Sequence, residues 1–185
     1  MSFMTEVFAD REAARRSEVK ASWIRVLMGF LQYPGLRGLL LYRVGHGARR
    51  MTLRLQYRLF DPLIRFFSGS RISTDTEIGA GLSVPHPRSI IMGDRTKIGA
   101  RVYILQADTF GASGKKKPDG QSRPHVGDDV LIGAGAGLVG PITTGNRVRV
   151  GANAVVTMDL PDDCTMVGNP GRVARAGERR IGLIE

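Results

Sequence analysis

The feature of this sequence that most limits its fold is an aliphatic residue that recurs every six positions. The series contains a two-residue shift, is interrupted at about 107–124, and then resumes with six members and no slip. Its members are Ile72, Ile78, Val84 and Ile90, then Met92, Ile98 and Ile104, and finally Val126, Ile132, Leu138, Thr144, Val150 and Val156. A period of six matches neither the turn of an α-helix nor the alternation of an ordinary strand. It matches the hexapeptide repeats of a parallel β-helix, in which each short strand sends one aliphatic side chain inward.

Two further regularities support a β-helix. Glycine follows several members of the series, where it permits a sharp corner, and small or apolar residues lie two positions before many of them. Three hexapeptides form one triangular coil, so the repeats supply roughly five coils, with residues 107–124 extruded as a loop. An ordinary β sandwich with accidental spacing is the alternative, and the unbroken run after residue 126 makes it much the weaker one.

The N-terminal part of the chain follows a helical pattern instead. One helix is expected around Trp23–Leu31, a second on the apolar residues Leu36, Leu39, Leu40 and Val44, and a short third one from Asp61-Pro62 to Phe67. We therefore divide the chain into an α-helical segment (1–70), a β-helix domain (71–175) and a C-terminal tail (176–185).

Composition excludes several classes of protein. A single cysteine, Cys164, excludes a disulfide framework and a multi-thiolate zinc site, and the three histidines lack metal-motif spacing, so no metal is expected. The net charge is +10, and residues 1–71 hold 13 Lys and Arg against five Asp and Glu. Such a basic segment attracts phosphate groups or a membrane surface, whereas no nucleic-acid-binding motif is present. With no signal peptide and no apolar stretch long enough to span a bilayer, we expect a cytoplasmic protein, with peripheral contact at the inner membrane surface as a further option.

Several short motifs occur in a fixed order along the chain. They include Tyr42-Arg43-Val44-Gly45-His46, Ile78-Gly79-Ala80-Gly81, Val102-Tyr103-Ile104-Leu105-Gln106, Thr109-Phe110-Gly111-Ala112-Ser113-Gly114-Lys115 and Gly168-Asn169-Pro170-Gly171-Arg172. On these motifs the chain resembles serine acetyltransferase and its polysaccharide-acetylating relatives over about residues 33–175, within the hexapeptide-repeat acyltransferases. The resemblance implies a mainly β fold, a left-handed parallel β-helix preceded by helices. It also implies acetyl-CoA as co-substrate and a homotrimer, or trimers paired through the N-terminal helices.

His86 is the predicted catalytic residue, because it occupies the position of the family's catalytic histidine. A neutral imidazole has the right pKa near pH 7 to remove the proton of an attacking hydroxyl group. The flanking Pro85 and Pro87 restrict the backbone on both sides. Without the family frame, a surface histidine between two coils would be the commoner interpretation.

The resemblance also assigns residues to acetyl-CoA and to the acceptor. Small residues of the glycine-rich loop, Gly111, Ala112 and Ser113, are expected to offer N–H donors to the thioester oxyanion. The pantetheine arm is expected along Ala134, Gly151 and Ala152, and the CoA phosphates at Lys115, Arg149 and Arg172. Arg123 and His125 are the candidates for acceptor binding. A mobile loop tip and solvated surface charge are the ordinary alternatives for these residues.

Departures from the family pattern concern the acceptor. Pro85 stands where serine acetyltransferases carry an aspartate, Arg71 stands where they carry the residue that orients the histidine, and Ser122-Arg123 replaces an Arg-His pair that holds the amino acid. We therefore predict an acetyl-CoA-dependent O-acetyltransferase whose acceptor is a sugar hydroxyl of a small or lipid-linked surface-polysaccharide precursor. The alternative is serine O-acetylation in cysteine biosynthesis. A non-catalytic β-helix that serves as a binding module is favoured least, because His86 and the glycine-rich loop are retained.

Overall fold

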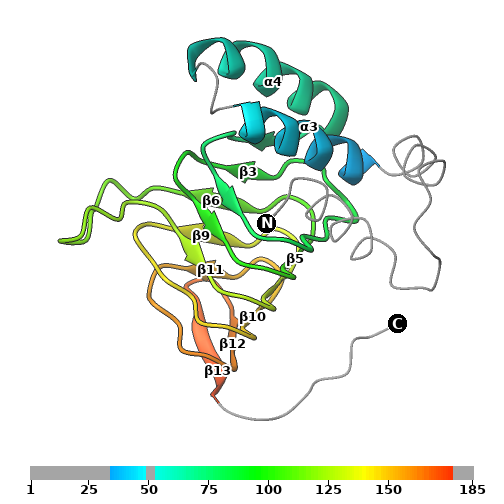
Figure 1. Cartoon of the computed structure of the whole chain (residues 1–185). Coiled ribbons are helices and arrows are strands. Elements are labelled where there is room, and N and C mark those ends of the chain that lie inside the picture. The colour runs from blue at the N-terminus through cyan, green and yellow to red at the C-terminus, as the bar shows by residue number, and fades with distance from the viewer. Residues whose placement is uncertain (1–33, 49–52, 177–185) are drawn as a thin grey trace.

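The computed structural model describes residues 34–48 and 53–176. In these ranges two helices lie on one end of a three-sided stack of short parallel strands (Figure 1). The helix expected around Trp23–Leu31, the basic residues before 34 and the tail beyond 176 lie outside the described residues.

The β-helix has three sheets, each forming one side of the coils. The first sheet, called face A, contains β1 (Arg71–Ile72), β3 (Ile91–Met92), β6 (Thr109–Gly111), β9 (Gly137–Val139) and β11 (Val155–Val156). Face B contains β2 (Glu77–Ile78), β4 (Lys97–Ile98) and β7 (His125–Val126). Face C contains β5 (Tyr103–Ile104), β8 (Leu131–Ile132), β10 (Arg149–Val150), β12 (Cys164–Val167) and β13 (Arg172–Ala176). All these pairs are parallel except β12 with β13, and the antiparallel β13 lies at the edge of face C.

The aliphatic series forms the core as predicted. In each two-residue strand the second side chain is buried, and strand pairing places it directly against its counterpart in the next coil. The inner stack of face A is Ile72, Met92, Phe110, Leu138 and Val156. Stacking one buried aliphatic side chain on the next removes apolar surface from water along the whole axis, which stabilises the coil.

Coil lengths show where extra residues leave the stack. Ile72 pairs with Met92, 20 positions later, whereas Leu138 pairs with Val156, 18 positions later. The two-residue shift in the repeat is therefore an insertion in the first coil. The second coil is regular, since Met92 pairs with Phe110, 18 positions later. The third coil carries a longer insertion, because Phe110 and Leu138 are 28 positions apart.

This longer insertion starts later than the sequence predicted. Residues 109–111 form β6, which pairs with β3 and β9, and Phe110 is completely buried. Only residues 112–123 leave the coil, and they project well beyond it (Figure 1), whereas the Pro124 carbonyl already accepts a hydrogen bond from the Lys97 amide. The predicted start at 107 was too early because Asp108 interrupts the apolar pattern although its side chain still points inward.

The two helices cover the open end of the first coil. Three side chains of α3 (Pro34–Ala48) contact backbone carbonyl groups there. The Tyr42 hydroxyl donates to the Thr76 carbonyl at 2.6 Å, the Arg43 guanidinium donates to the Ile78 carbonyl at 2.6 Å, and Nδ1 of His46 lies 2.9 Å from the Thr74 carbonyl oxygen. A parallel coil leaves its terminal edge without a pairing strand, so these contacts satisfy groups that would otherwise be unpaired.

α4 (Leu53–Ser68) differs from the predicted short helix. It begins well before Asp61-Pro62 and runs through Pro62, which lies on the exposed side. Its side chain Ile64 is fully buried in the common core, and Phe60 packs against that core. Packing of this apolar face therefore outweighs the hydrogen bond that proline removes. Within the described ranges, neither helix is long and apolar enough to cross a membrane.

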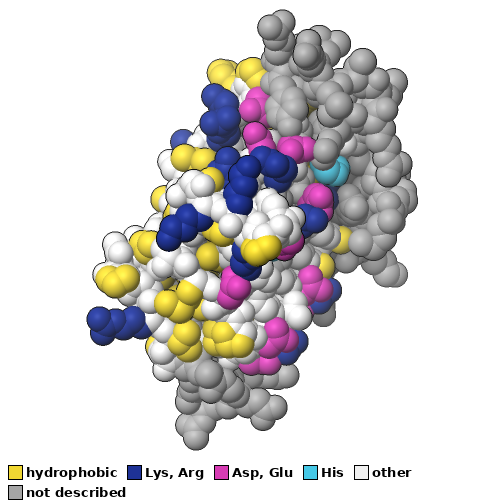
Figure 2. Space-filling model, turned by 90° about the vertical axis from the view of Figure 1, so that its left-hand side faces the viewer, with side chains coloured by type: hydrophobic (Ala, Val, Ile, Leu, Met, Phe, Trp, Pro, Cys, Tyr) yellow, Lys and Arg dark blue, Asp and Glu magenta, His cyan; other side chains and the backbone are white. Residues whose placement is uncertain are grey.

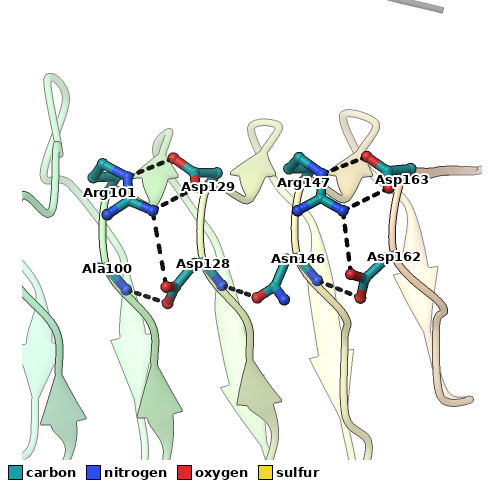
Figure 3. A network of polar contacts seen from close by, with 8 residues as sticks. All are labelled: Ala100, Arg101, Asp128, Asp129, Asn146, Arg147, Asp162 and Asp163. Carbon is teal, nitrogen blue, oxygen red and sulfur yellow. Dashed lines mark hydrogen bonds and ion pairs between the residues drawn. The ribbon is translucent and has the colours of Figure 1, made fainter. Parts of the chain in front are cut away.

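The corner between faces B and C carries a ladder of alternating charge (Figure 3). Arg101 binds Asp129 through two hydrogen bonds of 2.7 and 2.6 Å, and Arg147 binds Asp163 in the same way at 2.6 and 2.7 Å. All four residues have a positive φ of 55–58°. The bidentate pairs join successive coils at a corner where the backbone conformation is unfavourable for side-chain-bearing residues.

Candidate active site

His86 lies in the two-residue insertion of the first coil. Four residues separate Val84 from Ser89, whereas two separate the equivalent Ile104 and Ala107 in the next coil. The extra length carries His86 outward, and its side chain is exposed. An irregularity in the repeat thus coincides with the predicted catalytic residue.

The insertion is anchored to the rigid coil on its C-terminal side. The Ser70 hydroxyl donates to the Pro87 carbonyl at 2.5 Å and accepts from the Ile90 amide at 3.1 Å. The Arg88 amide donates to the His86 carbonyl at 2.8 Å, which closes a tight turn. Pro87 is buried between these contacts. The backbone that carries the imidazole is therefore held by a buried serine rather than left as a free loop.

A pocket of about 510 Å³ opens beside this turn. It is bounded by the C-terminal end of α4, by the insertion and by one residue of the next coil, and its lining residues are Phe66, Phe67, Ser68, Gly69, Pro85, His86, Pro87, Arg88 and Gln106. His86 and Arg88 are the titratable side chains among these lining residues, and no carboxylate is one of them. A concave site with aromatic walls and a few polar groups is typical of small-molecule binding.

Neither Arg71, which stands where the family carries the residue that orients the histidine, nor the carboxylate of Asp75 lines this pocket. Arg71 is exposed on β1 of face A, and Asp75 lies in the turn between β1 and β2. Among the described residues no side chain hydrogen-bonds to the imidazole of His86.

Small residues continue the corner below His86. Gly135 donates its amide to the Gln106 carbonyl and Asn153 donates to the Ala134 carbonyl, so Gln106, Ala134 and Ala152 occupy equivalent positions in successive coils. We call this the alanine column. The predicted pantetheine residues Ala134 and Ala152, with Gly151 next to them, therefore share one corner with His86.

The predicted phosphate-binding arginines lie on face C, which adjoins this corner. Arg149 is half-buried on β10, and Arg172 is exposed on β13. Both strands pair with β12. Their arrangement is compatible with one anionic ligand that runs down the column, and their role stays a prediction.

The predicted oxyanion donors are not beside His86 in one chain. Residues 85–88 precede β3, whereas Ala112, Ser113 and Lys115 follow the parallel strand β6, at the opposite edge of face A. Gly111, the last residue of β6, accepts a hydrogen bond from the Gly140 amide at 2.9 Å. The loop is fixed to the coils by an ion pair of 2.9 Å between Lys117 and Asp159.

The two acceptor candidates are also separated from His86. The Arg123 guanidinium lies near Gly93, at the loop edge of face A. His125 lies on β7 of face B, where burial and the Lys97 ammonium hold the pKa of its imidazole below the ordinary value. Neither residue lines the pocket around His86.

Sequence reasoning missed the other walls of the pocket. Phe66 and Phe67 were assigned only to a helix, and Arg88 and Gln106 were given no role. The two-residue shift in the repeat could have pointed to these walls. Extra residues at a corner of a regular coil must protrude, and here they protrude beside the end of α4, which packs on the first coil.

One buried carboxyl group lies inside the coil next to this region. The side chain of Asp108 is completely buried, and its Oδ1 accepts a hydrogen bond of 2.7 Å from the Ala136 amide. Its Oδ2 has no hydrogen-bond partner among the described residues. Burial raises the pKa of Asp108 to about 7, although the backbone N–H groups of Ala136 and Gly135 act in the opposite direction.

Comparison with known proteins agrees with this architecture. The family described as "Hexapeptide repeat of succinyl-transferase" matches residues 125–158. Among solved structures, serine acetyltransferase from Neisseria gonorrhoeae has a TM-score of 0.84 at 25% identity, over 96% of this chain and 67% of that one. Soybean serine acetyltransferase complexed with serine has a TM-score of 0.82 at 33% identity, over 94% of this chain and 70% of that one. This likeness confirms the predicted left-handed parallel β-helix preceded by helices.

Proteins similar in sequence identify the family within the hexapeptide-repeat proteins more specifically. Serine acetyltransferase of Helicobacter pylori strain J99 is 41% identical over 138 residues, which are 75% of this chain and 80% of that protein. The Bacillus pumilus enzyme is 35% identical over 175 residues, 95% of this chain and 76% of that protein. The Synechococcus elongatus enzyme is 37% identical, and the match covers only 61% of its length. With its coils, its corner histidine and these relatives, the chain belongs to the serine acetyltransferase family of hexapeptide-repeat acyltransferases.

Proposed function

We propose that this acyltransferase moves an acetyl group from acetyl-CoA to a hydroxyl group of a small acceptor, with His86 as general base. The observation that carries the proposal is the position of His86. It is exposed on an anchored insertion, at the wall of a pocket, and two residues before Arg88, which holds the position above Gln106 in the alanine column. The pocket is the space for the acceptor and the column is the path for the pantetheine arm.

The reaction needs one proton to be moved twice. The imidazole of His86 takes the hydroxyl proton while the acceptor oxygen attacks the thioester carbonyl carbon. Backbone N–H groups of the glycine-rich loop stabilise the oxyanion that forms. When the carbon–sulfur bond breaks, His86 returns the proton to the leaving thiolate, so that an O-acetyl ester and free CoA thiol are produced. Holding both reactants beside one base replaces a bimolecular encounter by a positioned one.

The site residues lie at two edges of one face, which supports a site shared between copies. His86 precedes β3, and the loop that contains Ala112 and Ser113 follows β6, at the opposite edge of face A. A closed ring places the loop of one copy against the His86 edge of the next, and cyclic symmetry stops further growth. We therefore propose a homotrimer, alone or paired with a second trimer.

The relatives support L-serine as the acceptor. The similar proteins from H. pylori, B. pumilus and soybean are all named serine acetyltransferases, and the soybean structure contains serine. Serine is therefore the acceptor to test first.

A sugar hydroxyl is the second candidate, and one observation favours it. Serine is zwitterionic, so a site that selects it needs a carboxylate for the ammonium group. The residues that line the described pocket include an arginine and two phenylalanines but no carboxylate. An acceptor from a surface-polysaccharide precursor requires no ammonium partner.

Thiol release separates the two acceptors. Purified full-length protein is assayed with acetyl-CoA and either L-serine or a panel of sugars and glycosyl phosphates. A kcat/KM for serine of about 10⁴ M⁻¹s⁻¹ or above, within the ordinary enzyme range, identifies a serine acetyltransferase. A lower value for serine with a higher one for a sugar identifies the sugar acetyltransferase. No release above acetyl-CoA hydrolysis with any acceptor would contradict both.

A further inference from the structure

We propose that the acceptor pocket is built for a phosphorylated sugar, with Phe66 against the sugar ring and Arg88 on the phosphate. This inference rests on the proposed function, because it takes the pocket beside His86 to be the acceptor site. It specifies the substrate class from two side chains that the catalytic proposal does not use.

The first observation is the exposure of Phe66. Its side chain is 82% exposed, although it belongs to a helix whose inner face is well buried at Ile64. It contacts Phe67 edge to face, with ring centroids 5.2 Å apart and an interplanar angle of 89°. One large aromatic surface is therefore left open at the rim of the pocket. A flat, mostly C–H ligand face, such as that of a pyranose ring, removes such a surface from water.

The second observation is the charge of the pocket. Arg88 is exposed and lines the pocket, and it forms no ion pair with any described residue. Arg65, on the same helix as Phe66, lies 3.5 Å from Asp61 and so already has an acidic partner. With no carboxylate in the lining, an anionic acceptor group is the complementary partner of Arg88.

Both observations concern one wall of the molecule. Phe66 comes from the end of α4, and Arg88 is the last residue of the segment 85–88 that contains the insertion. The side-chain amide of Gln106, from the next coil, can hydrogen-bond to hydroxyl groups of a ligand. The side of the molecule from which the extruded loop projects, at the other edge of face A, carries Lys and Arg side chains interspersed with acidic and hydrophobic ones (Figure 2). A sugar phosphate can place its ring against Phe66, its hydroxyl groups on the Gln106 amide and its phosphate on the Arg88 guanidinium. A free amino acid would instead leave its ammonium group beside the positive charge of Arg88.

Binding is the primary test, because it does not require turnover. Full-length wild-type protein and the Arg88→Gln, Phe66→Ala and Leu63→Ala variants are titrated calorimetrically with glucose 1-phosphate and with glucose. Leu63 is the matched control, since it is an exposed apolar residue of the same helix that does not line the pocket. Removing a charge-assisted contact is expected to weaken glucose 1-phosphate binding about tenfold or more in Arg88→Gln and to leave glucose binding within about twofold. Phe66→Ala is expected to weaken both ligands, and Leu63→Ala neither.

Thiol release with the same ligands distinguishes failure of this inference from failure of the proposed function. Phosphate-dependent binding through Arg88 without thiol release contradicts acetyl transfer at this site but supports the ligand class. Thiol release without a preference for the phosphorylated sugar, or an equal loss of both ligands in Arg88→Gln, overturns the inference alone. A change of mass in light scattering for Phe66→Ala with unchanged binding also overturns it, because Phe66 would then belong to a contact between copies.

A last arm identifies the source of the phosphate. The same glucose phosphate esterified to a farnesyl chain is presented in detergent micelles. A lower KM for this compound than for soluble glucose 1-phosphate assigns the pocket to a lipid-linked precursor. The reverse order assigns it to a soluble sugar phosphate, and either order supports the class of ligand.

Discussion

Replacement of Asp108 by valine should change how the stability of the protein depends on pH. Asp108 is completely buried, and its neighbours in the coils on either side are the apolar residues Ile90 and Ala136. Its ordinary pKa is 3.8, and burial raises the pKa to about 7 in the folded chain. Between these values the folded state holds a proton that the unfolded chain has released. The free energy of unfolding therefore falls as pH rises from about 4 to about 7.

The size of the effect follows from the two pKa values. Ionising Asp108 in the folded chain costs up to about 4 kcal/mol relative to the unfolded chain, at 1.36 kcal/mol for each pH unit between 3.8 and about 7. Between pH 5 and pH 8 the part that is lost is about 2 to 3 kcal/mol. The hydrogen bond from the Ala136 amide offsets little of it, because the second oxygen of the carboxyl group has no partner among the described residues.

Urea unfolding followed by circular dichroism at fixed protein concentration measures this effect. Other groups also titrate, so the quantity to compare is the difference between Asp108→Val and wild type at pH 5 and at pH 8. We expect the variant to gain about 2 to 3 kcal/mol on wild type over this range. Asp94→Asn, which changes an exposed carboxylate, is the control and should show no such gain. A difference for Asp108→Val that stays constant within about 0.5 kcal/mol would refute the argument from burial.

Three further predictions follow from the same structure. Gly127→Ala should destabilise the protein by more than about 2 kcal/mol in urea unfolding, because its methyl group would meet the Gly145 carbonyl carbon at 2.6 Å. The control Gly137→Ala, whose added methyl group has its nearest atoms at 4.0 Å, should cost less than about 0.5 kcal/mol. Equal losses in the two variants would contradict the close packing of successive coils at their corners. Tyr42→Phe should cost about 1 to 2 kcal/mol in the same assay, since it leaves the Thr76 carbonyl without the Tyr42 hydroxyl, and an unchanged midpoint would show that the helix does not seal the coil. Light scattering should give three or six times the chain mass of 20.1 kDa at micromolar concentration, and a monomer mass would remove the shared site.

Much of the fold was predictable because one physical rule governs it. Each coil needs one apolar side chain per face, so a period of six in aliphatic residues reveals the three sheets and their register. Where a polar residue occupies an inward position, the apolar repeat is interrupted in the sequence. Asp108 is such a residue, and the segment that contains Phe110 was therefore assigned to a loop although it belongs to the coil. The helix through Pro62 was misjudged for a related reason, since tertiary packing of Ile64 against the coil outweighs the local preference of proline.

The candidate site was only partly predictable. The resemblance pointed to His86, and the repeat itself contained the two-residue insertion that exposes it. The walls that Phe66 and Arg88 contribute were not visible, because they come from a helix end and a turn that only the three-dimensional packing brings together. His125 was predicted to bind the acceptor, yet it lies on β7 of face B and does not line the pocket around His86.

The central claim, that His86 is the general base of an acetyltransferase, is tested most directly by CoA thiol release from acetyl-CoA in wild type and in His86→Ala. The assay uses L-serine and the best sugar acceptor, and circular dichroism confirms that the variant keeps its fold. Loss of a general base predicts that turnover falls by a factor on the order of 10²–10⁴. Turnover of the folded variant within about twofold of wild type would contradict the claim.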